Sequence, residues 1–321
     1  MFGFNKAANH TNTQTIASTL DSRRGFIRGL GVGAASAMAF GGGALTTSSA
    51  KADATLDLEI LNFALNLEYL EAEFYLLAAT GMGLSPADIG PNPGIVTGGH
   101  QVTFNNTLVS AYALEIAEEE RKHVRFLRAA ITALGGTPVS RPAIDLRNSF
   151  KTLANAAGLG SDFNAFTNSN HFLLASYVFE DVGVTAYHGA ATSITSPAIL
   201  DRAAGIMAVE AYHAGLIRTV LFAEGFSSDT AAISNLRAIL DGTAGTMNLD
   251  DRGVGTLQSP TIVDCSDSLN GSLLGGYPNP PPGNNSIAFD RTTRQVLNIV
   301  YGAQNAKNGL FFPSGLNGAI N

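Results

Sequence analysis

The chain has 321 residues, of which 45% are hydrophobic and 14% are charged. This composition excludes an intrinsically disordered protein, which has few apolar residues for its charge. The formal net charge of −7 argues against nucleic acid and anionic lipid surfaces as partners, because both are polyanions.

The first 52 residues differ in composition from the rest. The stretch "SRRGF" at 22–26 precedes a run rich in glycine and alanine that ends in Ala-Lys-Ala at 50–52. This order is similar to a bacterial twin-arginine export signal. A membrane anchor and a disordered tail are the alternatives, although a spanning helix needs about 20 predominantly apolar residues. We expect cleavage after Ala52, a periplasmic or extracellular location without stable membrane insertion, and a mature chain with 14 basic and 25 acidic residues, a net charge of −11.

Four long segments with the periodicity of packed helices follow, separated by clusters of glycine and proline. They cover residues 56–79, 104–134, 168–192 and 197–224. The connection over 81–103 is predicted to be a long irregular loop. The connection over 135–167 is long enough to cross the length of a bundle, with a short helix near 145–157. Only the third and fourth helices are joined by a short link, which predicts that they are antiparallel neighbours.

The last third of the chain is more irregular. A fifth helix is predicted from about 226 to 240, a short helix over 290–301, and the terminal "FFPSGLNG" is expected to anchor the tail through its two phenylalanines. Cys265 is the lone cysteine, so the chain has no internal disulfide. We predict three regions, namely an export signal (1–52), a four-helix bundle (53–226) and a C-terminal helical and irregular extension packed on the bundle (227–321).

Each long helix carries at least one carboxylate on its apolar stripe, the line of residues expected to face the core. Two of the helices add a histidine three residues after the glutamate. An unpaired buried carboxylate is very costly, and none of the four stripes contains lysine or arginine. The ionisable residues on the stripes are Glu68 and Glu71, Glu120 and His123, Glu180, and Glu210 and His213.

A pair of metal ions would neutralise these groups. Four carboxylates balance two divalent cations, and neutral imidazoles complete the coordination. Binuclear sites in four-helix bundles use one glutamate from each of two helices and Glu-x-x-His from the other two. Solvated or salt-bridged acids are the competing interpretation, but the recurrence of the pair favours a metal site. We expect the adjacent Glu118 and Glu119 to face solvent with Arg121 and Lys122.

Two motifs resemble a known family. "NLEYLEAEFY" at 66–75 is similar to the first-helix pattern of ferritins, and "EERKH" at 119–123 is similar to the ferritin pattern E-E-R-x-H. With the "FFPSGLNG" tail they resemble the exported, desiccation-related branch of the ferritin-like superfamily, over about 57–225 and the tail. The long first loop, the extra C-terminal third and the export signal depart from cage ferritins and argue against an iron-storage cage.

The resemblance implies an all-α, ferritin-like four-helix bundle with a long crossover loop and a C-terminal extension. It also implies two iron or two manganese ions as cofactors. The ligands that it implies are Glu68, Glu120, His123, Glu180, Glu210 and His213.

Several nearby residues have alternative roles. Glu71 could replace Glu68 or act as a shifting second ligand. Tyr75 and Tyr187 either pack in the core or hydrogen-bond a ligand and carry a radical, and Tyr75 is the candidate catalytic residue. His188 is expected to lie outside the ligand set.

Three classes of function fit these features. The first is redox chemistry at a di-iron or di-manganese centre, either ferroxidase-like or peroxide-consuming, with O₂ or peroxide as the reactant and a homo-oligomer as a possible assembly. The second is a non-enzymatic protein that protects against stress or sequesters metal. The third is an oxygenase of an organic substrate, which would need a substrate cavity and a reductase partner.

Overall fold

A computed structural model describes residues 46–244, 252–255, 266–267 and 287–321. The chain divides into two parts, Met1–Ser48 and Ser49–Asn321, and the second contains nearly all of the described residues. The predicted twin-arginine motif and Cys265 lie outside the described residues.

The described part of the chain is predominantly helical, which confirms the all-α prediction. Each predicted helix has an observed counterpart, and the first begins earlier than predicted. The helices are α2 (Thr46–Thr80), α3 (Thr107–Ala133), α4 (Asn148–Ala156), α5 (Ser169–Ala191), α6 (Pro197–Ala223), α7 (Ser227–Asp241) and α8 (Thr293–Tyr301).

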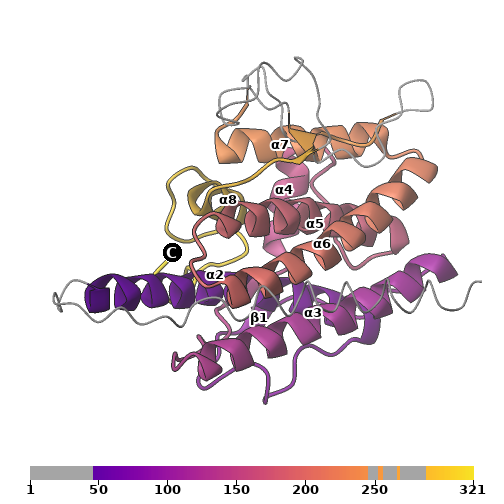
Figure 1. Cartoon of the computed structure of the whole chain (residues 1–321). Coiled ribbons are helices and arrows are strands. Elements are labelled where there is room, and N and C mark those ends of the chain that lie inside the picture. Colours follow the sequence, from indigo (N-terminus) through magenta and orange to yellow (C-terminus); the bar gives the residue numbers. More distant parts are fainter. Residues whose placement is uncertain (1–45, 245–251, 256–265, 268–286) are drawn as a thin grey trace, which may run out of the picture. The chain divides into compact units, whose positions relative to one another are not determined.

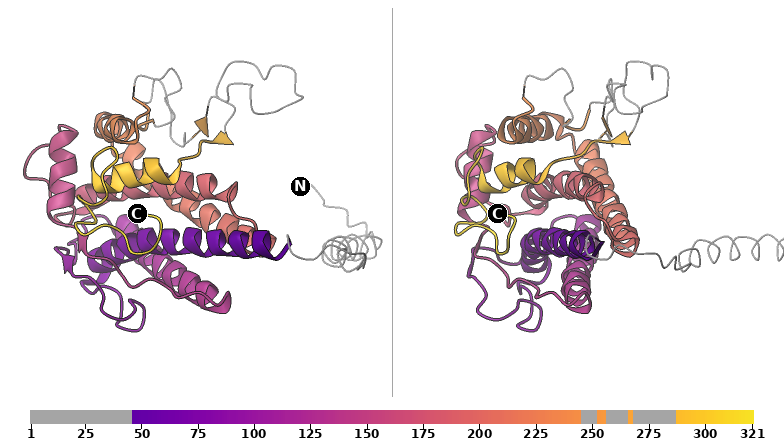
Figure 2. Two further views of the ribbon diagram at one scale, coloured as in Figure 1. Left: turned by 90° about the vertical axis from the view of Figure 1, so that its left-hand side faces the viewer. Right: turned by 60° about the vertical axis from the view of Figure 1, so that its left-hand side comes forward.

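The four long helices α2, α3, α5 and α6 form the bundle. Helices α2 and α3 run side by side, and α7 and α8 lie on the side of α5 and α6 that is away from α3 (Figures 1 and 2). A buried carboxylate links α2 to the start of α6. The Asp57 carboxylate in α2 accepts hydrogen bonds from the backbone N–H groups of Thr195 (2.8 Å) and Ser196 (3.0 Å), where α6 begins.

Two short strand pairs lie outside the bundle. Strand β1 (Val96–Thr97) in the first long connection pairs in parallel with β2 (Ile144–Asp145) in the second. Strand β3 (Ser266–Asp267) pairs antiparallel with β4 (Ile287–Ala288). A two-residue strand has too little periodicity to be predicted, so the first connection was expected to be irregular throughout.

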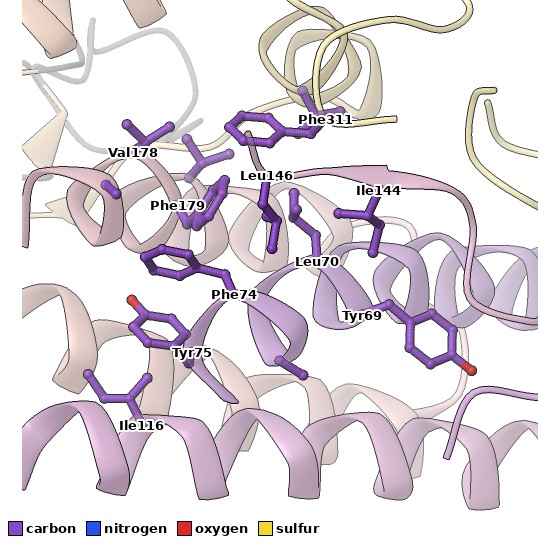
Figure 3. Packing of buried hydrophobic residues seen from close by; sticks show 14 of the residues in the cluster. Tyr69, Leu70, Phe74, Tyr75, Ile116, Ile144, Leu146, Val178, Phe179 and Phe311 are labelled. Atoms are coloured by element: carbon purple, nitrogen blue, oxygen red, sulfur yellow. The ribbon is translucent and has the colours of Figure 1, made fainter. Parts of the chain in front are cut away.

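Aromatic side chains fill the core beside α2. The ring of Phe74 stacks on Phe172 at 5.5 Å and meets Phe179 edge-on at 5.5 Å. Phe311 from the C-terminal tail packs against Phe179, with ring centroids 5.0 Å apart. Figure 3 shows both residues among the buried side chains. Phe311 and Phe312 are both buried, which confirms that they anchor the tail.

The tail is also hydrogen-bonded to α2. The Asn66 side-chain amide donates to the Asn317 carbonyl (2.8 Å), and the Asn317 backbone N–H donates to Asn66 Oδ1 (3.0 Å). The two residues are 251 positions apart in the chain. These reciprocal bonds attach the tail to α2 at Asn66, two residues before Glu68.

Buried arginines join the C-terminal extension to the bundle. Asp181 in α5 accepts hydrogen bonds from Arg218 in α6 (2.8 Å) and from Arg237 in α7 (2.9 Å). Arg291 donates to Asp241 within the extension at 3.0 Å and to the Thr185 hydroxyl of α5 at 2.9 Å. None of these arginines was expected to be buried. Their burial requires paired carboxylates, because an isolated charge in the interior is very costly.

Helix α6 is unusually apolar for its length. Among the described helices it alone is long and apolar enough to cross a membrane by those two criteria. Its Glu210, His213 and Arg218 are all buried against other helices. The structure buries 44% of the most apolar window of α6.

Candidate metal centre

The four long helices bring the six predicted ligand residues together inside the bundle. Each of them is buried. Their side chains form two overlapping groups in which the possible ligand atoms lie within 4.8 Å of one another. The first group is Glu68, Glu120, His123 and Glu210, and the second is Glu120, Glu180 and His213.

Glu120 belongs to both groups and faces both histidines. Its Oε1 lies 3.1 Å from Nδ1 of His213, and its Oε2 lies 3.4 Å from Nδ1 of His123. One carboxylate that presents a separate oxygen to each group has the position of a bridging ligand between two ions. The Glu-x-x-His spacing on α3 produces this arrangement, since residues three apart share a helix face.

Each group also has a carboxylate of its own. Glu68 Oε2 lies 3.2 Å from Nδ1 of His123, and Glu180 Oε2 lies 3.4 Å from Nδ1 of His213. Glu210 adds an oxygen 3.6 Å from His123 Nδ1. Both halves of the cluster therefore combine carboxylate oxygens with one imidazole nitrogen, the ligand types that iron and manganese accept.

Unpaired polar atoms show that the cluster fits a cation. Both oxygens of Glu120, both oxygens of Glu210 and Nδ1 of His213 are buried without a hydrogen-bond partner. Such atoms are rare in folded proteins because each costs free energy. In the described part of the chain no lysine or arginine pairs with the four carboxylates, whereas two divalent ions would match their charge.

Burial and mutual repulsion change the pKa values of the glutamates in the cluster. Burial raises the pKa of Glu68 to about 7, against the opposing attraction of His123. Burial, with repulsion from Glu120 next, raises the pKa of Glu210 well above its ordinary value. Burial acts the same way on Glu120, but the proximity of the His123 and His213 imidazoles outweighs it and lowers its pKa. A metal ion must therefore displace protons held by the cluster, so its affinity falls at low pH.

Two tyrosines donate hydrogen bonds to candidate ligands, one in each group. The Tyr75 hydroxyl donates to Oε1 of Glu180, and the Tyr187 hydroxyl donates to Oε1 of Glu68. Both side chains therefore hydrogen-bond a candidate ligand as well as packing in the interior. The catalytic role of Tyr75 stays a prediction.

Glu119 is an outer partner of the cluster, which corrects the expectation that it faces solvent. Its Oε2 lies 2.7 Å from Nε2 of His213, and its side chain is 30% exposed. Glu118, in contrast, pairs with Arg121 on the surface as expected. A carboxylate on the far nitrogen of a metal-binding histidine fixes the tautomer and orientation of the ring. The side of α3 that Glu119 occupies faces α6, a contact that the helical period alone does not reveal.

The remaining candidates lie outside the two groups. Glu71 is buried close to the cluster, and burial followed by repulsion from Glu120 raises its pKa well above the ordinary value. His188 is half-buried, and its Nδ1 has no hydrogen-bond partner. Leu108 at the start of α3 and Leu134 directly after its end are 50% and 46% exposed, so the buried face of this helix does not extend to its ends.

Comparison with known proteins places this geometry in context. Residues 56–223 match the family described as "Ferritin-like domain". The chain is 31% identical over 256 residues to "Desiccation-related protein PCC13-62" of Craterostigma plantagineum, covering 75% of this chain and 76% of that protein. It is 29% identical over 284 residues to "Ferritin-like catalase Nec2" of Nesocodon mauritianus, covering 82% of this chain and 84% of that protein.

Proposed function

The chain belongs to the ferritin-like domain family, in its desiccation-related branch, and we propose that its buried cluster binds two iron or two manganese ions that consume hydrogen peroxide. The observation that carries the proposal is Glu120, whose two unpaired oxygens face separate groups of ligands. The relative named a ferritin-like catalase supports peroxide as the reactant.

The two groups would supply the ligands. Glu68, His123 and Glu210 would hold one ion, and Glu180 and His213 would hold the other. Glu120 belongs to both groups and would contribute to both. The metal pair would supply the two-electron redox couple needed to convert two molecules of H₂O₂ into O₂ and two molecules of water.

The chain's own groups orient the ligands and hold protons. Glu119 accepts from Nε2 of His213, which leaves Nδ1 free to bind metal. The hydroxyls of Tyr75 and Tyr187 donate hydrogen bonds to Glu180 and Glu68. These bonds restrict the rotation of the two carboxylates. Burial excludes bulk water from the cluster and strengthens its electrostatic interactions.

Metal content and peroxide turnover test the proposal together. The protein purified from its native host should contain two iron or two manganese ions per chain, and elemental analysis decides between them. An oxygen electrode should record one O₂ for two molecules of H₂O₂ consumed. Glu120→Gln should lose both metal and turnover, whereas the surface control Glu118→Gln should retain them. Fewer than two ions after careful reconstitution with either metal would contradict the binuclear assignment.

A non-enzymatic role in stress protection or metal sequestration is the second candidate. The desiccation-related relative favours it, since its name describes a condition and not a reaction. The same samples separate the two functions, because a sequestering protein binds two ions without consuming peroxide. Fe(II) oxidation, followed optically under O₂, would indicate a ferroxidase-like reaction instead.

We also propose that the protein is exported through the twin-arginine route and cleaved after Ala52. The support is the sequence of the first 52 residues. This route would allow the bundle to fold and acquire metal before export. Mass spectrometry of exported protein should find Asp53 as the first residue, and an intact N-terminus would contradict cleavage.

A further inference from the structure

An apolar cavity of about 50 Å³ lies beside the metal centre, between α2, α5 and α8. Aliphatic and aromatic side chains make up most of its wall, including Leu67, Val182, Val296 and Phe311. The polar side chains at its wall are Glu68, Glu71 and Tyr187. Helix α8 and the tail supply part of the wall, so the C-terminal extension helps to build this cavity.

The cavity reaches the candidate ligands themselves. Glu68 lines it and belongs to the first group. Gly183 lines it from α5, and a Cβ atom at this position would lie 2.2 Å from Oε2 of Glu210. The absence of a side chain at Gly183 therefore leaves room for the Glu210 carboxylate at the wall.

The size and lining of the cavity restrict what it can hold. A buried water needs two to four polar partners, whereas an apolar cavity of about 150 Å³ stays dry and binds benzene or xenon. This cavity, at about 50 Å³, is too small for a benzene-sized molecule and has polar groups only where it meets the cluster. Its volume suits a diatomic gas and argues against an organic substrate at this position.

We propose that the cavity receives molecular oxygen at the metal centre. This inference rests on the proposed function, in which O₂ is the product of peroxide consumption. Hydrogen peroxide is polar and would lose hydrogen bonds to water on entering an apolar space, whereas O₂ loses none. The gas therefore partitions into the cavity as it is released, and the reactant does not.

The partly exposed polar partner of the cluster lies on another side. Glu119 on α3 is 30% exposed and contacts His213 on α6. No residue of α3 is among the described residues that line the cavity. The cluster therefore has a polar neighbour at α3 and α6 and an apolar space at α2 and α5.

The cavity also borders a larger outer cleft. Leu61, Tyr187 and Ala203 line both the cavity and a cleft of about 250 Å³ formed by α3 and α6. These three side chains form the partition between them.

Xenon is the probe for this inference. Metal-loaded full-length protein under pressurised xenon, studied by crystallography and by ¹²⁹Xe NMR, should bind one xenon atom beside Glu68. Ala64→Leu and Ala190→Leu, on α2 and α5, should each abolish this site by filling the cavity. Ala157→Leu is the matched control, because it lines a separate cavity between α4, α5 and α7 and should leave the site intact. Circular dichroism and metal content identify variants that are folded and loaded.

Turnover supplies a second readout. The filled variants should lower kcat and KM for peroxide together, several-fold, and leave kcat/KM unchanged, because O₂ release slows while peroxide entry does not. Ordered water in the cavity, or no bound xenon in a wild-type protein that consumes peroxide, would overturn the inference and leave the proposed function standing. Xenon bound in a metal-loaded protein that consumes no peroxide would instead refute the peroxide reaction, and with it O₂ as the product held there.

Discussion

Replacing Glu210 with glutamine should affect the metal-loaded and metal-free proteins differently. Glu210 is fully buried, and neither of its oxygens accepts a hydrogen bond. Burial, with repulsion from Glu120 next, raises its pKa well above the ordinary value, which favours the neutral carboxyl in the metal-free protein. Glutamine is neutral and has the same shape. The free energy of unfolding of the metal-free protein should therefore change by less than about 1.5 kcal/mol.

Under the proposed function, the metal-loaded protein loses a ligand and one of the four charges that would balance two divalent ions. Changes to outer partners of metal ligands already weaken binding by roughly 10–100-fold, and Glu210 lies in the ligand group itself. At a fixed free metal concentration well above both dissociation constants, a 100-fold loss of affinity lowers the free energy of unfolding by about 2.7 kcal/mol.

Glu73 is the matched control because it is a buried glutamate that has a basic partner. It forms an ion pair with Arg141 and accepts a hydrogen bond from the Leu84 backbone N–H at 3.3 Å. Glu73→Gln leaves the Arg141 charge without its carboxylate partner. This change should cost about 3–5 kcal/mol both with and without metal.

Urea unfolding measures the stabilities required, with saturating metal and with chelator for each variant and the wild type. The metal-site interpretation expects a loss for Glu210→Gln only in the loaded state and an equal loss for Glu73→Gln in both states. If Glu210→Gln destabilises the protein equally in both conditions, the reasoning is refuted. Glu120 is less suitable for this test, because His123 and His213 lower its pKa and keep it ionised without metal.

Three further predictions concern the surroundings of the cluster. Glu119→Ala should weaken metal binding by roughly 10–100-fold in a chelator competition assay, since His213 loses its outer partner; unchanged affinity would contradict the orienting role. Without metal, the free energy of unfolding should fall as pH rises from 4.5 to about 7, because folded Glu68 keeps a proton that the unfolded chain has released. Urea unfolding with chelator measures this free energy across the interval. A free energy that rises with pH would contradict the prediction. Tyr75→Phe removes the donor to Glu180 and should cost about 1–3 kcal/mol in urea unfolding. If Tyr75 is catalytic, this variant also loses peroxide turnover at unchanged metal content, whereas normal turnover limits Tyr75 to a structural role.

The bundle and the convergence of its polar residues could be predicted because both depend on local spacing. The helical period places Glu120 and His123 on one face of α3, and the same period places Glu210 and His213 on one face of α6. Once four such faces pack together, the polar positions must meet. The assignment of these residues as metal ligands stays a prediction.

Features that depend on which helices are neighbours could not be predicted in this way. Glu119 directly precedes Glu120 on a charged turn, and only the proximity of α6 makes it a partner of His213. Arg218 and Arg237 carry no apolar periodicity of their own. Their burial depends on Asp181 in α5 and on the position of α7, which lies in the extension. Spacing within one helix says nothing about either contact.

The reciprocal hydrogen bonds between Asn66 and Asn317 have a consequence for the order of biosynthesis. Residues 251 positions apart meet beside Glu68, so the ribosome makes the helix that bears this glutamate long before the segment that holds it. Contacts of such sequence separation form slowly, because the chain must close a long loop first. A nascent chain that has all six candidate ligands still lacks this support. Under the proposed function, metal binding by the fully supported site therefore follows translation and competes with the proposed export of the finished chain.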